Sequence, residues 1–577
     1  MASRPSPGGP PIPSAEPRPG PSRTGRCHPA IVLGYGVTGL AVVLLSGLTT
    51  QIAQVPVSAQ LGLFQMLPPS YWAGIALIVL SAILSVWTRS DALIALTGVI
   101  LLATLAGTPT LFEPFPRYLD AYGHFGEAQI LGALSHLPSD LTSYSANWPG
   151  AFLVLLTLFG SGGTTPIEFL SWYPFVAGGI TFLAFFELLR ATFVPTIARQ
   201  ASFPTALFAV WAQYHVSPQS LGFILLLLIL STVRRRETRW RFVAAGLFVG
   251  LVASHPTSAI MLLAILGVYA VVTLIPRFQD FGPKEDLRRD RKFSQRVAMT
   301  FAVVWLAWLF FLAVGSSQAA QVAIVARMNS VFGLPEQTLN MATQRTQSDL
   351  LYVAPRIRTA SIGLYGVFSL VSLAYLFRDR PSRDRFRLAF SALIGPGLVA
   401  FADIFAFGGQ FYDRSLLIMA TFVPALCFAG LARMRIPRGA KAIVVATLVG
   451  ASVATGATAY YLEAFNIVPG QAIAAADFVY SLPNGTLVLD GKYPTPIWLD
   501  PGERPIIVRF PYTNLWPLRL QDWHPGAPMY AVLDPTTELW YRQWYGAQIY
   551  SAYASGAQNY SEIYDNGWTQ VYYVPAG

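Results

Sequence analysis

The sequence predicts a polytopic α-helical membrane protein with a small C-terminal extracytoplasmic α/β domain. Three observations predict this class: 54% of the 577 residues are hydrophobic, only 12% are charged, and the apolar residues gather in long runs. Soluble domains carry about 25% charged residues, so this chain has too little polar surface to cover a water-soluble particle. The composition therefore excludes a soluble globular enzyme, and it also excludes a disordered or collagen-like chain.

The first 28 residues differ from the rest because they are rich in Pro, Gly, Ser and Arg. A segment of this composition cannot bury an apolar core, so we expect residues 1–28 to form a disordered cytoplasmic tail. The apolar run that follows lacks a convincing cleavage site, and we predict a retained first span rather than a signal peptide. Cys27 lies in the tail and Cys427 in an apolar run, which predicts neither a disulfide nor a thiolate metal site.

Thirteen apolar runs approach the length of about 17–25 residues that a membrane helix needs. They build a predicted multi-span domain over residues 29–462, with a long outer loop at 108–147. The predicted spans are 30–48, 71–87, 91–107, 168–189, 202–216, 218–233, 242–256, 258–276, 297–315, 359–377, 388–402, 415–432 and 440–462.

The basic residues predict the orientation. If the tail is cytoplasmic and the thirteen spans alternate, 28 of the 39 Lys and Arg lie on the cytoplasmic side. Cytoplasmic loops carry such an excess, so we predict an integral plasma-membrane protein with a cytoplasmic N-terminus and an extracytoplasmic C-terminus. The formal net charge of +10 is spread in short clusters between apolar runs, which predicts contact with membrane lipids and no nucleic-acid partner.

One short apolar segment, residues 148–160, disturbs this count. If it crossed the membrane, every later arginine cluster would lie outside. We therefore predict a helix that lies in the interface or enters the membrane only part way. The alternative is that the short pair 202–216 and 218–233 does not cross fully.

Residues 463–577 contain no span and are rich in Tyr, Trp and Pro. Strands are predicted at 485–490, 506–510 and 530–533. Residues 563–573 place Asn-Gly between alternating side chains, which is the strongest short hairpin signal. These patterns predict a small α/β domain outside the membrane.

The outer loop carries Asp120, His124 and Glu127, spaced i, i+4 and i+7. On a helix this spacing puts all three side chains on one face. A carboxylate beside an imidazole and a second carboxylate can act as a general base with a supporting partner. Asp120 and His124 can also bind a divalent metal, while no other cofactor is predicted. The alternative is an amphipathic interfacial helix whose polar face meets water.

Two histidines lie at outer span ends that are broken by proline, in Tyr214-His-Val-Ser-Pro-Gln219 and Ser254-His-Pro-Thr-Ser258. Backbone groups freed at such breaks usually line a cavity, so His215 and His255 are candidates for a site. The alternative is a helix-end histidine whose hydrogen bonds are satisfied locally.

A late span begins with Tyr412, Asp413 and Arg414. An arginine there is costly unless it is paired or reaches the interface. Its planar fork suits a phosphate, and the helix N-terminus adds donors on the same side. The alternative is a simple Asp413–Arg414 pair or an interfacial anchor.

Taken together, four features resemble the C-type (GT-C) membrane glycosyltransferases, whose members include protein mannosyltransferases, the aminoarabinose transferases of lipid A and the oligosaccharyltransferases. The first is the acidic motif Tyr118-Leu-Asp-Ala-Tyr-Gly-His124, and the second is the segment from Trp148-Pro-Gly150, which is similar to the family's Tyr-Pro-Pro element. The third is the late span from Tyr412 to Pro424, and the fourth is the ending Ile563-Tyr-Asp-Asn-Gly567. The chain departs from the family in two ways. Two spans precede the usual first one, and no paired Asp-Glu or Asp-x-Asp surrounds Asp120.

The resemblance implies a GT-C-like bundle that transfers a sugar, with inversion, from a polyprenyl phosphate or diphosphate. Asp120 would match the carboxylate that takes the proton of an acceptor hydroxyl, and Arg414 the arginine that holds the lipid phosphate. The other expected substrate-binding residues are His124, Glu127, His255, Tyr412 and Asp413. The sequence does not indicate the sugar or the acceptor.

Two other function classes stay open from the sequence. A transporter or flippase of a lipid-linked or amphipathic solute needs a path to both faces and polar residues deep in the bilayer. A membrane scaffold with an outer binding domain leaves Asp120 and Arg414 scattered and solvated. A glycosyltransferase instead predicts that Asp120, His124, His255 and Arg414 converge on one cavity.

Overall fold

The computed structural model describes most of the chain. The residues outside the description are 1–27, 57–58, 135–143, 210–211, 234, 236, 276–283, 319–320, 322–351, 379–382, 407–410, 461–465, 484, 491–505, 510–519, 521–525 and 545–546. The predicted N-terminal tail, Cys27 and the predicted domain boundary at residue 463 therefore lie outside the described residues.

Eight helical segments are long and apolar enough to cross a membrane. They are α1 (Pro29–Thr49), α3 (Pro69–Thr88), α4 (Asp91–Phe112), α8 (Pro166–Thr192), α16 (Val353–Arg378), α17 (Arg383–Ala406), α18 (Tyr412–Ala420) continued by α19 (Val423–Arg433), and α20 (Arg438–Gly456). The other bundle helices are α9 (Pro195–Phe208), α10 (Pro218–Val233), α11 (Thr238–Ser254), α12 (Pro256–Val272) and α13 (Lys284–Phe311). Every predicted span overlaps one of these helices, and the number thirteen stays a prediction.

Local sequence signals set where these helices begin. Proline occupies the first turn of α1, α3, α8, α9 and α12, where its missing N–H costs nothing. At α8, the hydroxyl of Thr165 accepts from the backbone N–H of Glu168, and the Glu168 carboxylate accepts from that of Thr165. This capping box fixes the start of the helix that follows the outer loop.

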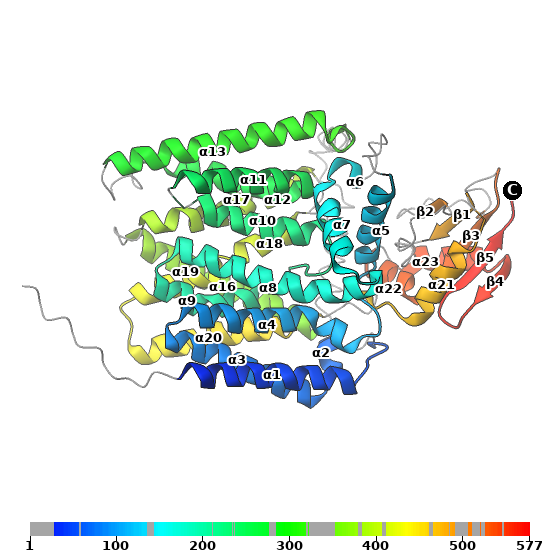
Figure 1. Cartoon of the computed structure of the whole chain (residues 1–577), viewed down its shortest axis with the longest axis horizontal. Coiled ribbons are helices and arrows are strands. Elements are labelled where there is room, and N and C mark those ends of the chain that lie inside the picture. Colours follow the sequence, from blue (N-terminus) through cyan, green and yellow to red (C-terminus); the bar gives the residue numbers. More distant parts are fainter. Residues whose placement is uncertain are drawn as a thin grey trace, which may run out of the picture.

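The two N-terminal spans form a tight pair, which small residues make possible. A Cβ on Gly39 would lie 2.6 Å from the carbonyl oxygen of Gly74, and one on Gly74 would lie 2.7 Å from that of Gly39. Small residues let membrane helices approach this closely. The helices α1 and α3 therefore pack backbone to backbone, and they lie side by side at one edge of the bundle (Figure 1).

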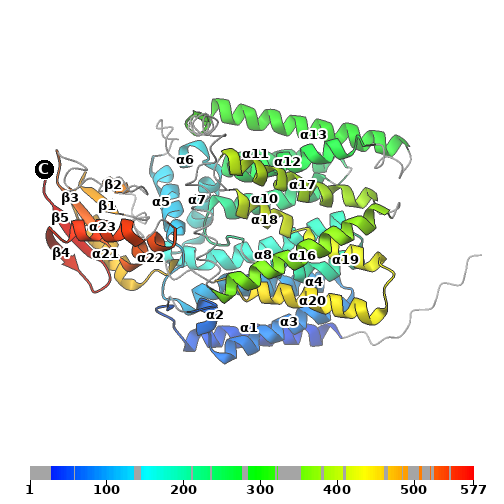
Figure 2. The same cartoon turned by 180° about the vertical axis from the view of Figure 1, so that it is seen from behind.

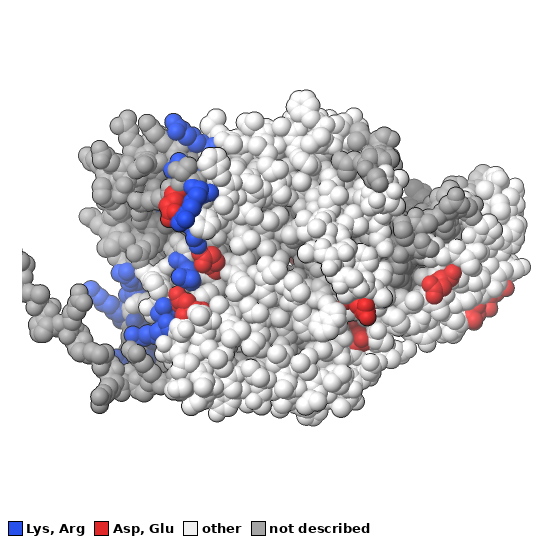
Figure 3. Space-filling model, in the orientation of Figure 1, with Lys and Arg blue, Asp and Glu red and all other residues white. Residues whose placement is uncertain are grey.

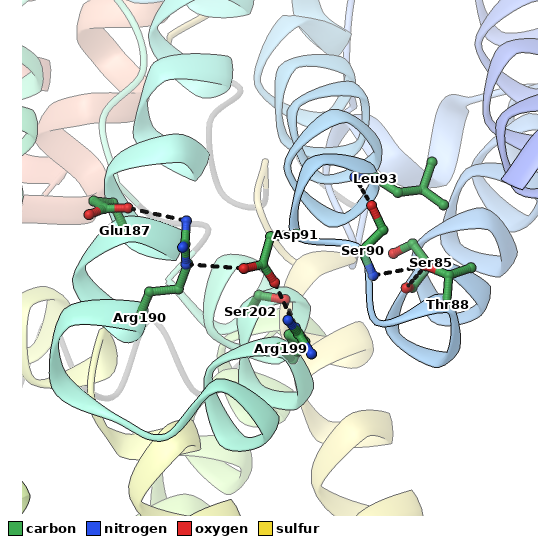
Figure 4. Close-up of polar contacts among 9 residues, drawn as sticks. All are labelled: Ser85, Thr88, Ser90, Asp91, Leu93, Glu187, Arg190, Arg199 and Ser202. Carbon is green, nitrogen blue, oxygen red and sulfur yellow. Dashed lines mark hydrogen bonds and ion pairs between the residues drawn. The ribbon is translucent and has the colours of Figure 1, made fainter. Parts of the chain in front are cut away.

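Positive charge gathers at one end of the bundle. On the face shown in Figure 3, Lys and Arg collect at the end opposite the C-terminal domain. There Asp91, at the start of α4, forms ion pairs with Arg199 at 2.6 Å and with Arg190 at 3.3 Å. Arg190 also forms an ion pair with Glu187 (Figure 4). Glu187 also pairs with Arg235. We call this end of the bundle the arginine end.

Three short helices cap the other end of the bundle. They are α5 (Leu119–Leu134), α6 (Tyr144–Asn147) and α7 (Gly150–Gly162). In both views α5 and α7 run across the direction of the bundle helices, between them and the C-terminal domain (Figures 1 and 2). With 13 residues, α7 spans about 20 Å, which is shorter than the bilayer core. This arrangement agrees with the interfacial helix predicted for residues 148–160.

The C-terminal region folds around a five-stranded sheet of order β2-β1-β3-β5-β4. The strands are β1 (Leu487–Asp490), β2 (Ile506–Arg509), β3 (Met529–Leu533), β4 (Ser561–Asp565) and β5 (Gln570–Val574), and the helices are α21 (Gly470–Tyr480), α22 (Pro535–Trp544) and α23 (Ala547–Ala557). Strand β1 is parallel to both neighbours, whereas β5 is antiparallel to β3 and β4. The predicted hairpin is present, and Gly567 supplies its positive φ of 78°.

Candidate active site

The segment that leads into α5 is held in an unusual backbone conformation. Tyr118 has a φ of +79°, one of two positive values for non-glycine residues in the described part of the chain. Its N–H donates to the carbonyl oxygen of Asn466 at 2.9 Å, which ties the loop to the entrance of the C-terminal region. Such strained residues persist only where the surroundings over-determine them, and they cluster at functional sites.

Asp120, in the first turn of α5, hydrogen-bonds to a histidine from a distant segment. Its Oδ2 lies 3.1 Å from Nε2 of His215. The imidazole is 5% exposed, whereas the carboxylate is 33% exposed. The ring of Tyr118 stacks on the imidazole with centroids 4.3 Å apart. The carboxylate is therefore the accessible member of the pair, with the imidazole behind it.

The shared helix face predicted for Asp120, His124 and Glu127 is found on α5. Asp120, His124 and Glu127 are half-buried, while their neighbours Ala121, Tyr122, Gly123, Phe125, Gly126 and Ala128 are buried. Burial lowers the pKa of His124 to about 4, and the negative charge of Asp120 acts in the opposite direction. His124 is therefore neutral at neutral pH, and Asp120 lies close enough for its charge to affect the pKa of His124.

A buried ion pair braces the loop before Tyr118. Nε of Arg117 donates to the two carboxylate oxygens of Glu113 at 3.1 and 3.0 Å, and both side chains are almost completely buried. The guanidinium also lies over the ring of Tyr460, 5.6 Å from its centroid. The hydroxyl of Tyr122 donates to the carbonyl of Pro116 at 2.9 Å, which closes the turn onto α5.

We expect Glu113→Ala to lower the free energy of unfolding by about 3–5 kcal/mol, because it leaves the Arg117 charge buried without its carboxylate. Thermal unfolding of the purified protein in detergent measures the effect. The matched control is the double variant Glu113→Leu/Arg117→Met, which removes both charges and should destabilise less than Glu113→Ala. A Glu113→Ala protein as stable as wild type would show that the pair does not hold this loop.

His255 is placed by the break between α11 and α12. It is the N-cap of α12, and its Nδ1 accepts from the backbone N–H of Ser258 at 3.2 Å and lies 2.8 Å from the Ser258 hydroxyl. A Cβ on Gly222 of α10 would lie 2.7 Å from Cβ of His255. The close approach of α10 therefore fixes the backbone of this buried histidine.

Arg414, in the first turn of α18, is held by neutral side chains. Its Nε donates to Oε1 of Gln219 at 3.0 Å and its Nη1 donates to Oγ1 of Thr257 at 3.1 Å. Among the described residues the half-buried guanidinium forms no ion pair with a carboxylate, so the alternative Asp413–Arg414 pair is not formed. Asp413 acts on Arg414 electrostatically. Asp413 and Tyr412 are exposed.

Electrostatic interactions connect the two halves of the site. Arg414 and His124 both lie within electrostatic range of His255. Burial raises the pKa of Tyr144 in α6, the charge of Arg414 opposes this, and that of Glu127 adds to it. Asp120, His124, Glu127, His255 and Arg414 thus belong to one connected set near the capping helices.

The metal prediction has less support. Among the described residues no group of three His, Cys, Asp or Glu side chains is arranged to hold a metal ion. The imidazole that hydrogen-bonds to Asp120 is that of His215, and His124 forms no hydrogen bond with Asp120 in the part of the chain that the structure describes. The described geometry therefore provides a carboxylate–imidazole pair and not the ligand set that Asp120 and His124 suggested.

Three residues that were not assigned to the site from the sequence belong to the surroundings of the predicted ones: Gln219 and Thr257 accept hydrogen bonds from Arg414, and the charges of Arg414 and Glu127 act on Tyr144. His215, a candidate from the sequence, lies against Asp120. His215, Gln219 and Thr257 all lie within three residues of Pro218 or Pro256. The proline-broken span ends, which already indicated His215, were the signal that could also have identified Gln219 and Thr257. Tyr144 carries no comparable signal.

Comparison with known proteins gives distant structural likenesses. No protein-family model and no curated protein matches the chain. The chain is similar to the archaeal oligosaccharyltransferase AglB from Archaeoglobus fulgidus, in complex with an inhibitory peptide and a dolichol-phosphate, at 11% identity and a TM-score of 0.48 over 83% of this chain and 74% of that one. It is also similar to ArnT from Cupriavidus metallidurans bound to undecaprenyl phosphate, at 12% identity and a TM-score of 0.43 over 88% and 98%.

A further structure of an Archaeoglobus fulgidus oligosaccharyltransferase, in complex with Zn and sulfate, is 13% identical with a TM-score of 0.44, over 82% of this chain and 72% of that one. Such enzymes are among those that the sequence motifs resemble. Likenesses at this distance do not assign an activity, so the functional conclusion rests on the geometry of the site.

Proposed function

We propose that the protein is a membrane glycosyltransferase that transfers a sugar from a polyprenyl-phosphate-type lipid donor to an acceptor on the outer face of the membrane. The observation that carries the proposal is the environment of Arg414. Gln219 and Thr257 hold its guanidinium without a carboxylate partner among the described residues, in the same connected set as the Asp120–His215 pair.

The guanidinium suits a phosphate. A half-buried cation held by neutral acceptors keeps its charge available for an anionic ligand, and the fork geometry of Arg matches phosphate oxygens. Two bonds to Gln219 and Thr257 orient the fork in advance, so little conformational freedom is lost when the donor binds. We assign Arg414 to the phosphate of the lipid donor.

The carboxylate suits the acceptor. Asp120 takes the proton of an acceptor hydroxyl as the hydroxyl oxygen forms its bond to the anomeric carbon of the sugar. The bond from that carbon to the phosphate oxygen breaks, and its electron pair leaves with the phosphate. Arg414 stabilises the charge that develops there. Attack opposite the leaving phosphate inverts the sugar carbon.

The distribution of charge supports an outer-face location. The arginine end lies opposite the C-terminal domain, and cytoplasmic ends of membrane proteins carry the excess of Lys and Arg. Under this rule the C-terminal domain, the capping helices and the site are all extracytoplasmic. The alternative of a transporter or flippase lacks a supporting observation, because the described site residues gather near the capping helices.

A panel of radiolabelled polyprenyl-phosphate sugars tests the proposal. Membranes that contain the full-length protein should consume at least one donor, release free polyprenyl phosphate and move the label into a product that no longer carries the lipid. Membranes without the protein supply the background. Accumulation of intact labelled lipid in the opposite leaflet, with no donor consumed, would instead support a flippase.

A further inference from the structure

We propose that His215 is a positioning residue, which holds the Asp120 carboxylate with a hydrogen bond and keeps it ionised. This role rests on the proposed function, in which Asp120 takes the acceptor proton. It adds to that function a residue from the segment between α9 and α10, 95 positions along the chain from Asp120.

The polarity of the contact follows from the chemistry of the two groups. An ionised carboxylate only accepts hydrogen bonds, so Nε2 of His215 carries the proton and donates it to Oδ2 of Asp120. The other nitrogen, Nδ1, is buried and has no hydrogen-bond partner among the described residues. A second proton there would be a buried donor without an acceptor, which is costly. His215 is therefore a fixed donor to Asp120, and its Nδ1 offers no onward path for a proton within the described part of the chain.

The surroundings of the ring fix where it points. Tyr118 stacks on one face at 4.3 Å with an interplanar angle of 25°, and Tyr118 is itself held by its backbone bond to Asn466. The next turn of the chain is closed by the N–H of Ser220, which donates to the hydroxyl of Ser217 at 3.1 Å. The imidazole thus meets the carboxylate in one orientation.

Other titratable groups also surround Asp120, and a pH experiment must hold them constant. His124 lies close enough to interact electrostatically with Asp120. The same region holds Glu127 on α5, the Glu113–Arg117 pair and Tyr118 in the preceding loop, and Tyr144, His255 and Arg414. Helix α7 contributes no titratable side chain. Because all of these are unchanged in variants of position 215, a difference between such variants reports on His215.

Three variants separate the hydrogen bond from the packing. His215→Phe keeps a ring against Tyr118 but removes the donor. His215→Gln places an amide N–H near the position of Nε2. Tyr214→Phe is the control, because the neighbouring phenol is buried and its hydroxyl has no hydrogen-bond partner among the described residues. Full-length protein in lipid nanodiscs is used throughout, and a melting temperature near the wild-type value establishes that each variant is folded.

The first measurement needs no substrate. A carbodiimide labels protonated carboxyl groups, and mass spectrometry follows its reaction with Asp120 as a function of pH. Loss of the donor raises the pKa of a carboxylate, so we expect the labelling midpoint of His215→Phe to lie about one pH unit above wild type. His215→Gln and Tyr214→Phe should stay near the wild-type midpoint. An unshifted midpoint in folded His215→Phe overturns the role of His215.

The second measurement uses the transfer reaction. Asp120 acts in its ionised form, so a raised pKa moves the acid limb of the pH–rate profile to higher pH. We expect this limb to move by about one unit in His215→Phe and to return in His215→Gln, a shift that a purely structural role would not produce. A labelling shift in a protein that consumes no donor would remove the proposed function and keep the His215–Asp120 contact. Sugar transfer with no shift in either measurement would keep the proposed function and remove the role of His215.

Discussion

Asp120→Asn should reduce sugar transfer by about 10²–10⁴-fold, which is the contribution of a positioned general base. Asparagine has nearly the same shape and can still accept the hydrogen bond from Nε2 of His215, so the fold and the contact behind the side chain are retained. What is lost is the capacity to take a proton from the acceptor hydroxyl. Initial rates of donor consumption, measured at saturating donor, report the loss.

The control for this variant is Asp477→Asn. Asp477 is an exposed carboxylate on α21, and its side chain takes no part in the site. The same change of charge there should leave transfer within about twofold of wild type. A comparable rate in Asp120→Asn would show that Asp120 is not the base, and the carboxylate–imidazole pair would then need another role.

The part of the fold that depends on the burial of apolar side chains could be predicted from the sequence. Long apolar runs and clusters of arginine are one-dimensional signals, and they predicted the helices of the bundle and the end at which charge collects. The prediction of a span over 202–216 was wrong in extent, because α9 ends at Phe208 and His215 lies beyond it. Hydropathy counts apolar side chains but not backbone conformation. Pro218 disfavours a helical conformation of Ser217, so a new helix, α10, begins at Pro218.

Within one helix, the site also follows from the sequence. The spacing of Asp120, His124 and Glu127 predicted a shared face, and these three are less buried than their neighbours on α5. The contacts between helices could not be predicted in this way. Whether Asp120 meets His124 or His215, and whether Arg414 meets Asp413 or Gln219, depends on which helices are neighbours and how each is rotated. A single sequence contains no such information.

The same limit explains the metal hypothesis. A carboxylate and an imidazole at i and i+4 fit a metal site and a general base equally well as sequence patterns. The structure places His215 against Asp120 and leaves His124 beside the pair as a neutral ring. The described contacts of Asp120 therefore include a carboxylate–imidazole pair with His215, which the spacing of Asp120 and His124 did not indicate.

Arg414→Ala should raise the KM for the lipid donor by about 100-fold, because charge-assisted hydrogen bonds to phosphate are each worth about 1.5–3 kcal/mol. Binding should suffer more than the reaction of the bound donor, so kcat should fall by a smaller factor. The donor KM of Arg414→Lys should lie between those of wild type and Arg414→Ala. An ammonium keeps the charge, but it cannot bond to Gln219 and Thr257 and also present a fork to phosphate. Steady-state kinetics with the donor identified by the panel give both constants.

Arg542→Gln is the matched control, because Arg542 lies on α22 in an exposed pair with Glu538 and should leave the donor KM unchanged. Gln219→Ala provides a second comparison: it removes one bond that orients the guanidinium while the charge remains, so it should raise KM by less than Arg414→Ala. A donor KM that does not change in Arg414→Ala would separate this arginine from the phosphate. The environment of the guanidinium would then no longer support transfer from a lipid phosphate. Gln219 and Thr257 support the proposal only if the guanidinium that they orient binds the phosphate of the donor.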